Sequence, residues 1–275
     1  MTDRSPAVGR PARRSPWIRL ALPGILVLAA CNSGGQYLQM GAEDLYAWST
    51  AAYNDENWDD AVEGYERMIF MFPAHDSIVQ VRLNLARSYY ERNEYVTASA
   101  EFARLIDRHP THPLVASASL GVCESYAALS PIPERDQEFT QTALNSCTSI
   151  LLDFPGTPEA QRAREIRDNM INKLAEKEYL RGYFYFRRGF YDSANVYFEQ
   201  VLSLYPRSPS AANSLLRMLE GYERIGYEEE AEEVRSRLLR EYPDSEAAST
   251  VRASRSAPQA VPDTTAVPDT SGVVR

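Results

Sequence analysis

The chain has 275 residues, with 38 acidic and 29 basic side chains and a formal net charge of −9 at pH 7. A net negative charge repels the phosphate backbone of nucleic acids, so the composition argues against a nucleic-acid-binding protein. Hydrophobic residues make up 44% of the chain and 17 residues are tyrosines, which is enough to build a substantial folded core.

The first thirty residues have the composition of a secretory signal peptide. Five arginines and one aspartate precede residue 20, and an apolar segment of eleven residues follows over 20–30. Such a segment is too short to span a bilayer, which needs about 20 residues. A basic region, a short apolar region and small residues before a cleavage point are typical of a signal peptide. We therefore expect residues 1–30 to be removed.

Cys31 directly follows the expected cleavage point. The four residues Leu28-Ala29-Ala30-Cys31 resemble the lipobox of bacterial lipoproteins. The resemblance implies a covalent lipid on Cys31, a fatty acid such as palmitate on the new N-terminus, and membrane attachment through these acyl chains alone. An ordinary signal peptide followed by a chance cysteine is the alternative. Asn32, where an aspartate would retain the lipoprotein in the inner membrane, implies the outer membrane, and we expect residues 31–41 to form a tether.

A five-fold repeat occupies the middle of the chain. An aromatic residue or histidine followed by proline occurs five times, and an alanine stands twelve residues before each of these prolines. The alanines are Ala61, Ala98, Ala143, Ala194 and Ala231. A small residue at a helix contact, an aromatic residue one turn later and a proline that ends the second helix are typical of tetratricopeptide repeats. The pattern predicts an all-α fold of about ten helices, arranged as five helix hairpins in a superhelical solenoid.

Turn residues and prolines within each repeat predict where its helices begin and end. We expect the first helices of the five hairpins at 42–53, 77–91, 114–128, 159–187 and 209–224. We expect the second helices at 58–71, 95–108, 137–153, 191–204 and 228–241. Repeats one to three then occupy residues 42–156, and repeats four and five occupy residues 157–245. The unusually long helix 159–187 contains no proline, and we expect it to bridge these two groups.

The C-terminal residues 246–275 have a different composition. They are rich in Ser, Ala, Pro and Thr, contain no aromatic residue, and repeat the segment AVPDT twice. Because such a segment buries too little apolar surface to offset the entropy of ordering, we predict a disordered tail.

No pattern in the chain is typical of an active site. Metalloprotease, serine-hydrolase and phosphate-binding-loop motifs are absent from the sequence, so we expect no enzyme and no catalytic residue. His109 and His112 flank a proline without a third ligand nearby, and we expect no metal site. Cys123 and Cys147 fall on facing helices of repeat three. Two alternatives remain open for them, a disulfide formed in an oxidising compartment or two buried free thiols.

Four local segments resemble the BamD family of outer-membrane assembly lipoproteins. They are PTHP at 110–113, RDQ at 135–137, KLAEKEYLRGYFYFRRGFY at 173–191 and YERIGYEEEA at 222–231. The resemblance covers roughly residues 42 to 243. It implies a periplasmic scaffold without cofactor or catalysis. Such a scaffold binds a POTRA domain of the barrel protein BamA, works with other lipoproteins of the assembly machinery and receives unfolded outer-membrane proteins.

The same resemblance implies the positions of the BamA contact. Glu178, Tyr185, Arg187 and Arg188 match the family segment near the end of the long helix. A helix cap is the alternative role for either arginine, because cations are favoured at helix C-termini. One departure concerns the following helix, where Val196-Tyr197 stands in place of the Asn-Arg of several family members. If that arginine serves the coupling to BamA, this chain must build the coupling differently.

Stacked repeats form a concave groove lined by their first helices. Those helices offer Tyr46, Trp48, Arg82 and Tyr89 as candidates for binding a client peptide, together with Tyr53, Asn84, Arg87 and Tyr90. A peptide that ends in an aromatic residue and a carboxylate needs an apolar slot and an arginine. Packing between helices is the alternative role for most of these aromatics. Two rival functions remain, a repeat lipoprotein of another envelope complex, such as one for cell-wall synthesis, and an enzyme with its active site in the groove.

Overall fold

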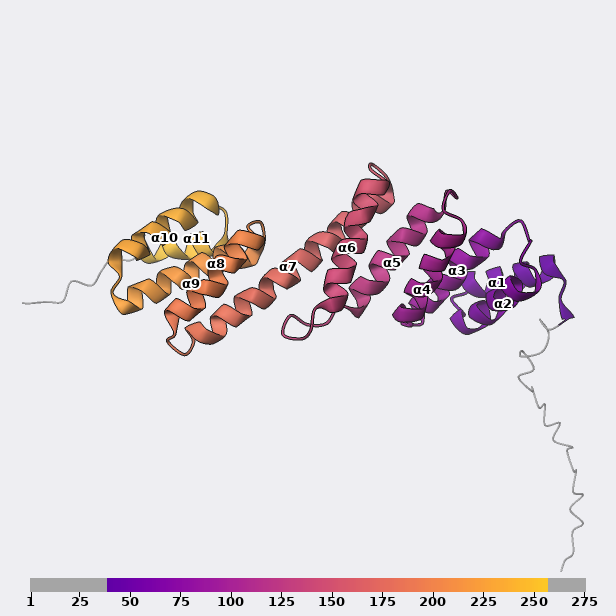
Figure 1. Ribbon diagram of the computed structural model, residues 1–275, viewed down its shortest axis with the longest axis horizontal. Helices are drawn as coiled ribbons and strands as arrows, with labels where there is room; N and C mark the ends of the chain where they lie inside the picture. Colours follow the sequence, from indigo (N-terminus) through magenta and orange to yellow (C-terminus); the bar gives the residue numbers. More distant parts are fainter. Residues whose placement is uncertain (1–38, 257–275) are drawn as a thin grey trace, which may run out of the picture. The chain divides into compact units, whose positions relative to one another are not determined.

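A computed structural model describes residues 39–256, and this range contains eleven α-helices and no β-strand. Successive helices lie beside one another in chain order (Figure 1). The first ten form five hairpins: α1 (Ala42–Asn54) with α2 (Trp58–Met71), α3 (Ile78–Glu91) with α4 (Tyr95–Arg108), α5 (Val115–Leu129) with α6 (Glu138–Asp153), α7 (Pro158–Phe186) with α8 (Tyr191–Leu204), and α9 (Pro209–Ile225) with α10 (Glu228–Glu241). An eleventh helix, α11 (Glu246–Ser256), follows.

The predicted all-α hairpin fold is confirmed, and each of the ten predicted helices begins and ends within one residue of the observed bounds. The five repeat alanines are all buried, with exposed fractions between 0% and 3%. Two glycines at contacts between neighbouring helices allow a still closer approach. A Cβ atom on Gly121 of α5 would lie 2.4 Å from the ring of Phe102 on α4, and one on Gly182 of α7 would lie 2.7 Å from the ring of Phe198 on α8. Small residues therefore set the helix spacing, as the repeat pattern predicted.

Helix α7 belongs to two cores, as its predicted bridging role requires. Its first half contributes Ile166 and Met170 to a cluster with Ile150 of α6. Its second half contributes Phe186 to a cluster built from α8, α9, α10 and α11. A helix of 29 residues is about 43 Å long, so the two cores are joined by continuous helix rather than by a loop.

The loop between α5 and α6, residues 130–137, is fixed onto the middle of α7, and we call it the clamped loop. The Lys173 ammonium donates hydrogen bonds to the Ser130 hydroxyl at 2.6 Å and to its carbonyl oxygen at 3.2 Å. The Gln137 side chain, only 6% exposed, donates to the carbonyl oxygens of Ile132 at 2.8 Å and Arg135 at 3.1 Å. Burial lowers the pKa of Lys173 from its ordinary value. These contacts hold Glu134, at the tip of the loop, beside the second half of α7.

Cys123 of α5 and Cys147 of α6 are joined by a disulfide in the structure, which corresponds to the first of the two alternatives. Both cysteines are fully buried and belong to the core of the third hairpin. The bond links the two helices on either side of the clamped loop.

The predicted disordered tail begins too early. Residues 246–256 form α11, which buries Ala247, Ala248 and Val251 against α9 and α10. The Ser245 hydroxyl accepts a hydrogen bond from the Ala248 amide at 3.1 Å and so caps the helix start. The prediction was wrong for these residues because alanines pack closely against an apolar face that the preceding helices already provide. The remainder of the tail, 257–275, lies outside the described residues, as do the signal peptide, Cys31 and most of the tether.

Candidate functional site

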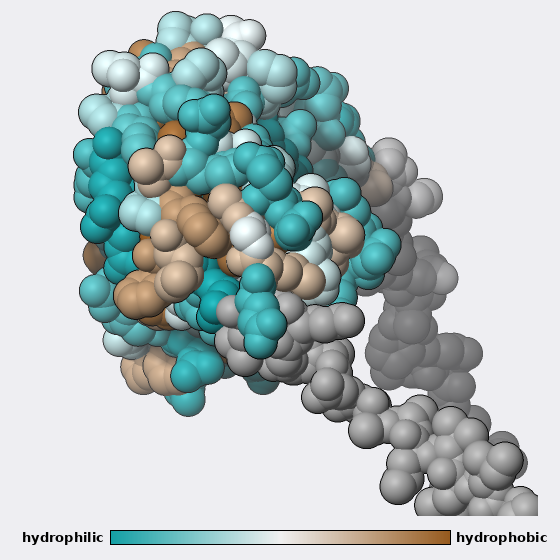
Figure 2. Space-filling model, turned by 90° about the vertical axis from the view of Figure 1, so that its right-hand side faces the viewer, coloured by the Kyte–Doolittle hydropathy of each residue, from teal (hydrophilic) through white to brown (hydrophobic). Residues whose placement is uncertain are grey.

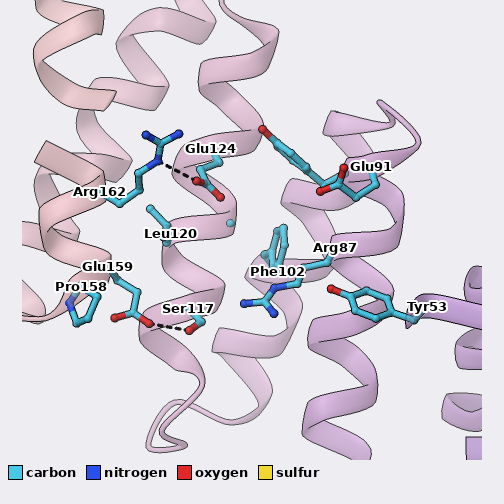
Figure 3. Close-up of a pocket in the computed structure, with 12 residues that line it drawn as sticks. Tyr53, Arg87, Glu91, Phe102, Ser117, Leu120, Glu124, Pro158, Glu159 and Arg162 are labelled. Carbon is cyan, nitrogen blue, oxygen red and sulfur yellow. Dashed lines mark hydrogen bonds and ion pairs between the residues drawn. The ribbon is translucent and has the colours of Figure 1, made fainter. Parts of the chain in front are cut away.

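A pocket of about 390 Å³ lies on the face built by the first helices of the hairpins (Figure 3). Its lining comes mainly from α3, α5 and α7, with one residue each from α1 and α4. The apolar part consists of Leu120, Phe102 and Gly121, with the rings of Tyr53 and Tyr90 beside them. The polar part consists of Arg87, Glu91, Ser117, Glu124, Glu159 and Arg162.

Two arginines reach this pocket from different helices. Arg162 of α7 approaches Glu124 of α5 with its Nε atom 3.5 Å from Oε1, and its side chain is still 58% exposed. Arg87 extends from α3 toward α5, below the ring of Phe102 (Figure 3). Burial raises the pKa of Glu124, while Arg162 and Arg87 act in the opposite direction. Two guanidinium groups beside an apolar floor offer partners to a carboxylate that carries an aromatic or aliphatic neighbour. Such a ligand competes with the pocket's own acids, because Arg162 is already paired with Glu124 and Glu165.

The four residues predicted for the client groove do not line this pocket. Tyr46 lies against the ring of His75, and the Trp48 ring lies against Gly64 of α2. The Tyr89 hydroxyl donates to Glu66 of α2 at 2.6 Å. Each of these rings therefore packs beside a neighbouring helix or turn. Packing is the alternative role that the sequence analysis gave for these aromatic residues.

Arg82 is buried instead of facing a ligand. Its exposed fraction is 8%, and its Nε atom has no hydrogen-bond partner. Burial lowers its pKa, with a further contribution from the positive charge of Arg108. Among the other groove candidates, Tyr53, Arg87 and Tyr90 do line the pocket. Arg162 and Glu124 were missed because they belong to α7 and α5, whose groove residues the sequence analysis did not consider.

A second candidate site, the α7–α8 surface, lies on the second half of α7. We define it by Lys177, Leu180, Arg181, Phe184, Tyr185, Arg187 and Arg188 of α7 and its C-terminal end, Tyr197 of α8 and Glu134 of the clamped loop. A hollow of about 440 Å³ lies among all of these residues except Arg187 and Arg188. Phe184 is 51% exposed and shares this hollow with Lys177 and Arg181.

Aromatic stacking organises the α7–α8 surface. The rings of Tyr185 and Tyr197 stack with centroids 5.4 Å apart. The Arg181 guanidinium lies 4.8 Å from the centroid of the Tyr197 ring, where a cation–π interaction is favourable. Glu178 is only 13% exposed in its side chain and pairs with Arg181 at 2.9 Å. Glu178 therefore holds Arg181 over the ring rather than facing outward itself.

The two arginines after α7 extend this surface. The Arg188 guanidinium lies 3.5 Å from the centroid of the Phe184 ring and donates to the Phe184 carbonyl oxygen at 3.2 Å. Arg188 thus caps the helix, which is the alternative role, and its exposed guanidinium also presents positive charge on this surface. Arg187 and Arg188 line an adjoining hollow with Glu134 and Phe184. The structure brings Tyr185, Arg187 and Arg188 to one surface. Lys177 and Arg181, which the sequence analysis missed, follow the helical spacing of 177, 181, 184 and 188.

The described residues hold no group of three or more His, Cys, Asp and Glu side chains arranged for a metal ion. Histidines instead stabilise the turns between hairpins. The Nδ1 atom of His112 accepts from the Leu114 amide at 3.2 Å, and that of His75 accepts from the Ser77 amide at 3.1 Å. Within the described range no helix combines the length and hydropathy of a membrane span.

A family model described as "YfiO: Outer membrane lipoprotein" matches residues 38–238, most of the chain. The chain belongs to this family. The YfiO match includes both candidate sites and begins after Cys31, so the expected lipidation position lies outside it.

Curated relatives agree with the YfiO assignment. The outer membrane protein assembly factor BamD of Rickettsia prowazekii is 26% identical over 80% of this chain and 88% of its own length. The protein of the same name from Caulobacter vibrioides is 26% identical over 71% of this chain and 64% of its own length. That of Neisseria meningitidis serogroup A is 25% identical over 80% of this chain and 89% of its own length.

Solved structures that resemble this YfiO family member are tetratricopeptide-repeat proteins. A repeat protein from Bacteroides fragilis superposes over 78% of this chain and 99% of its own, with a TM-score of 0.44 and 13% identity. The TPR2AB domain of yeast Sti1 covers 78% of this chain and 82% of its own, with a TM-score of 0.43 and 15% identity. These scores are low, so the fold assignment rests on the hairpins of the chain itself.

Proposed function

We propose that this protein is a lipid-anchored scaffold of the machinery that assembles β-barrel proteins in the outer membrane. Its membership of the YfiO family carries the proposal, together with relatives named as assembly factors over most of the chain. Stacked hairpins offer extended surfaces to other proteins, and the protein is a scaffold, not an enzyme.

The α7–α8 surface is the proposed contact for a POTRA domain of BamA. It combines exposed aromatic area with Lys177, Arg181, Arg187 and Arg188, and aromatic residues with arginine are enriched in interface hot spots. Arg181 and Arg188 are held by the rings beneath them, so little side-chain entropy is lost when a partner carboxylate binds. The expected partner surface is therefore acidic and offers an apolar contact for Phe184.

The arrangement around Tyr197 supports this role despite the departure from the family pattern. Residue 197 is a tyrosine at the position where the resemblance implies an arginine in several family members. In this chain Arg181 of α7 lies over the Tyr197 ring, so a guanidinium from the neighbouring helix is present beside residue 197. Arg181 would therefore supply the positive charge at this point of the proposed contact.

The pocket of Figure 3 is the proposed site for clients. Arg87 and Arg162 would pair with the C-terminal carboxylate of an unfolded outer-membrane protein, and Leu120 with Tyr90 would contact its last apolar side chains. This pocket is separated from the α7–α8 surface along α7, since Arg162 and Lys177, the nearest α7 residues of the two sites, are 15 positions apart, about 22 Å at helical rise. Both ligands could therefore be bound together.

The proposed anchor is a lipid on Cys31, which places the protein on the periplasmic face of the outer membrane. Lipoprotein maturation supplies more than one acyl chain, and attachment through several chains is stable whereas a single chain holds only marginally. The experiment that tests the function is affinity purification of the tagged full chain from detergent-solubilised outer membranes. Co-purification of BamA with further assembly lipoproteins supports the proposal. Recovery of cell-wall-synthesis proteins without BamA would assign the scaffold to another envelope complex.

A further inference from the structure

The turn between the first two hairpins carries an apolar segment with no charged residue. Residues 69–74, which we call the apolar tip, read Ile-Phe-Met-Phe-Pro-Ala and end α2. Phe70 is 83% exposed, the highest value among the large apolar side chains of the described residues, and Met71 is 48% exposed. Figure 2 looks onto the end formed by α1 and α2 and shows apolar residues gathered within a hydrophilic rim.

The apolar tip lies beside the point where the chain enters the fold. His75, just after the tip, places its Nε2 atom 3.2 Å from Glu43 in the first turn of α1. The same imidazole ring contacts the ring of Tyr46, with centroids 5.5 Å apart. The tip and the start of α1 are therefore fixed to each other. An anchor that keeps the start of α1 near a membrane also keeps the tip near that membrane.

The length of chain before α1 limits that distance. Cys31 is eleven residues before Ala42, and an extended chain covers at most about 3.6 Å per residue. If Cys31 carries the lipid, as the proposed function requires, the start of α1 stays within about 40 Å of the bilayer surface. An exposed phenylalanine and methionine within that reach gain free energy by entering the boundary between headgroups and acyl chains.

We propose that the apolar tip is a second membrane contact, which inserts Phe70 and Met71 into the phospholipid surface beside the lipid anchor. The inference rests on the proposed anchor at Cys31. The charges near the tip favour an apolar rather than an electrostatic contact, because the acidic Glu43, Asp44 and Asp76 outnumber Arg67 and would be repelled by anionic lipids. The contact would fix the orientation of the first hairpin on the membrane, whereas the acyl chains would supply retention.

The register of the repeat supplies a matched control. Leu152 stands three residues before Pro155, as Phe70 stands three residues before Pro73, and it is 75% exposed at the end of α6. Leu152 lies two hairpins farther from the anchor and has the same place in its hairpin. A tryptophan at either position changes the surface and leaves the buried core unchanged.

The test uses the full lipidated protein in vesicles of phosphatidylethanolamine with a minority of phosphatidylglycerol, whose acyl chains carry bromine as a fluorescence quencher. Phe70→Trp and Leu152→Trp each add one tryptophan to those of the wild type, and the added emission is measured by difference. We expect the bromine to remove most of the added emission at position 70 and little of it at position 152. We also expect high salt to leave the result unchanged, since an apolar contact is not screened.

Flotation of the same vesicles separates the possible results. Protein that floats while position 70 is no more quenched than position 152 overturns the tip proposal and leaves the anchor intact. Equal and strong quenching at both positions also overturns it, because the whole edge of the repeat would then lie on the membrane. Protein that does not float contradicts the anchor at Cys31 and the tip proposal together.

Discussion

Tyr185 of α7 and Tyr197 of α8 form an offset, nearly parallel stack, with ring centroids 5.4 Å apart and planes inclined by only 6°. This pair joins the two helices of the fourth hairpin at its surface. The Arg181 guanidinium lies over Tyr197, 4.8 Å from the centroid of its ring. Offset ring pairs and cation–π contacts each contribute about 0.5–1.5 kcal/mol beyond apolar burial. The surface proposed for BamA is therefore ordered before any partner binds.

The anchor is tested by Cys31→Ala. Without the thiol no diacylglyceryl group can be attached, and processing by lipoprotein signal peptidase follows that attachment. We expect the variant to remain unprocessed and to lose labelling by radioactive palmitate. Labelled protein in the outer-membrane fraction of the variant would show that the lipobox assignment is wrong.

The helix contact at the repeat alanines is tested by Ala194→Leu. Ala194 is fully buried, and its carbonyl oxygen would lie only 3.1 Å from a Cβ atom on Gly182. The larger side chain cannot be accommodated without separating α7 from α8, so we expect a loss of about 1–3 kcal/mol in the free energy of unfolding. Ser193→Leu, at the exposed neighbouring position, is the control. Denaturant unfolding that gives equal midpoints for both variants would remove Ala194 from the helix contact.

Truncation tests the role of α11. A stop after Ser245 removes Ala247, Ala248 and Val251, which are at most 4% exposed, and it uncovers the apolar faces of α9 and α10. We expect a loss on the order of 2 kcal/mol. This corresponds to a melting temperature lower by about 4–8 °C for a domain of this size. A stop after Ser256 is the matched control and should melt like the full chain. Equal melting of the two truncated proteins would mean that α11 contributes nothing.

Reduction tests the disulfide. Cys123 and Cys147 are 24 positions apart, and closing a loop of this size in the unfolded chain stabilises the folded state by about 3 kcal/mol. We expect dithiothreitol to lower the melting temperature by several degrees. The double variant Cys123→Ala/Cys147→Ala should be insensitive to the reductant. A wild-type protein whose melting is also insensitive would contain two free thiols.

The hairpins could be predicted from the sequence because their signals are local. A proline ends each second helix, and an alanine marks each helix contact at a fixed distance before it. The same register could have predicted α11. Helices α7, α9 and α11 begin three residues after Pro155, Pro206 and Pro243, respectively. The prediction for 246–256 relied on composition and not on this fixed spacing between proline and helix start. Alanines are nevertheless enough to bury a helix where the neighbouring helices supply the large apolar side chains.

The sites were less predictable because their contacts join residues that are distant in the sequence. The hydrogen bond from Lys173 to Ser130 spans 43 positions, and nothing in either segment indicates that the loop lies on α7. The pocket of Figure 3 likewise combines Arg87 with Arg162, which depends on the order in which the helices stack. Aromatic residues on first helices serve packing and binding alike, so their sequence positions did not separate Tyr46 and Tyr89 from Tyr53 and Tyr90.

The most direct test of the central claim is the affinity of the purified protein for BamA after charge reversal on the α7–α8 surface. Arg188→Glu replaces an exposed cation that lies on the ring of Phe184 and donates to the Phe184 carbonyl oxygen. Arg164→Glu makes the same charge change near the start of α7 and serves as the control. We expect Arg188→Glu to bind at least tenfold more weakly, a difference of about 1.4 kcal/mol. Because the variant also loses the helix cap and the contact with the Phe184 ring, we expect its melting temperature to fall by only about 2–4 °C. We expect Arg164→Glu to bind like the wild type. Wild-type affinity in Arg188→Glu, with binding abolished by Arg87→Glu in the pocket of Figure 3, would contradict the account and reverse the two sites.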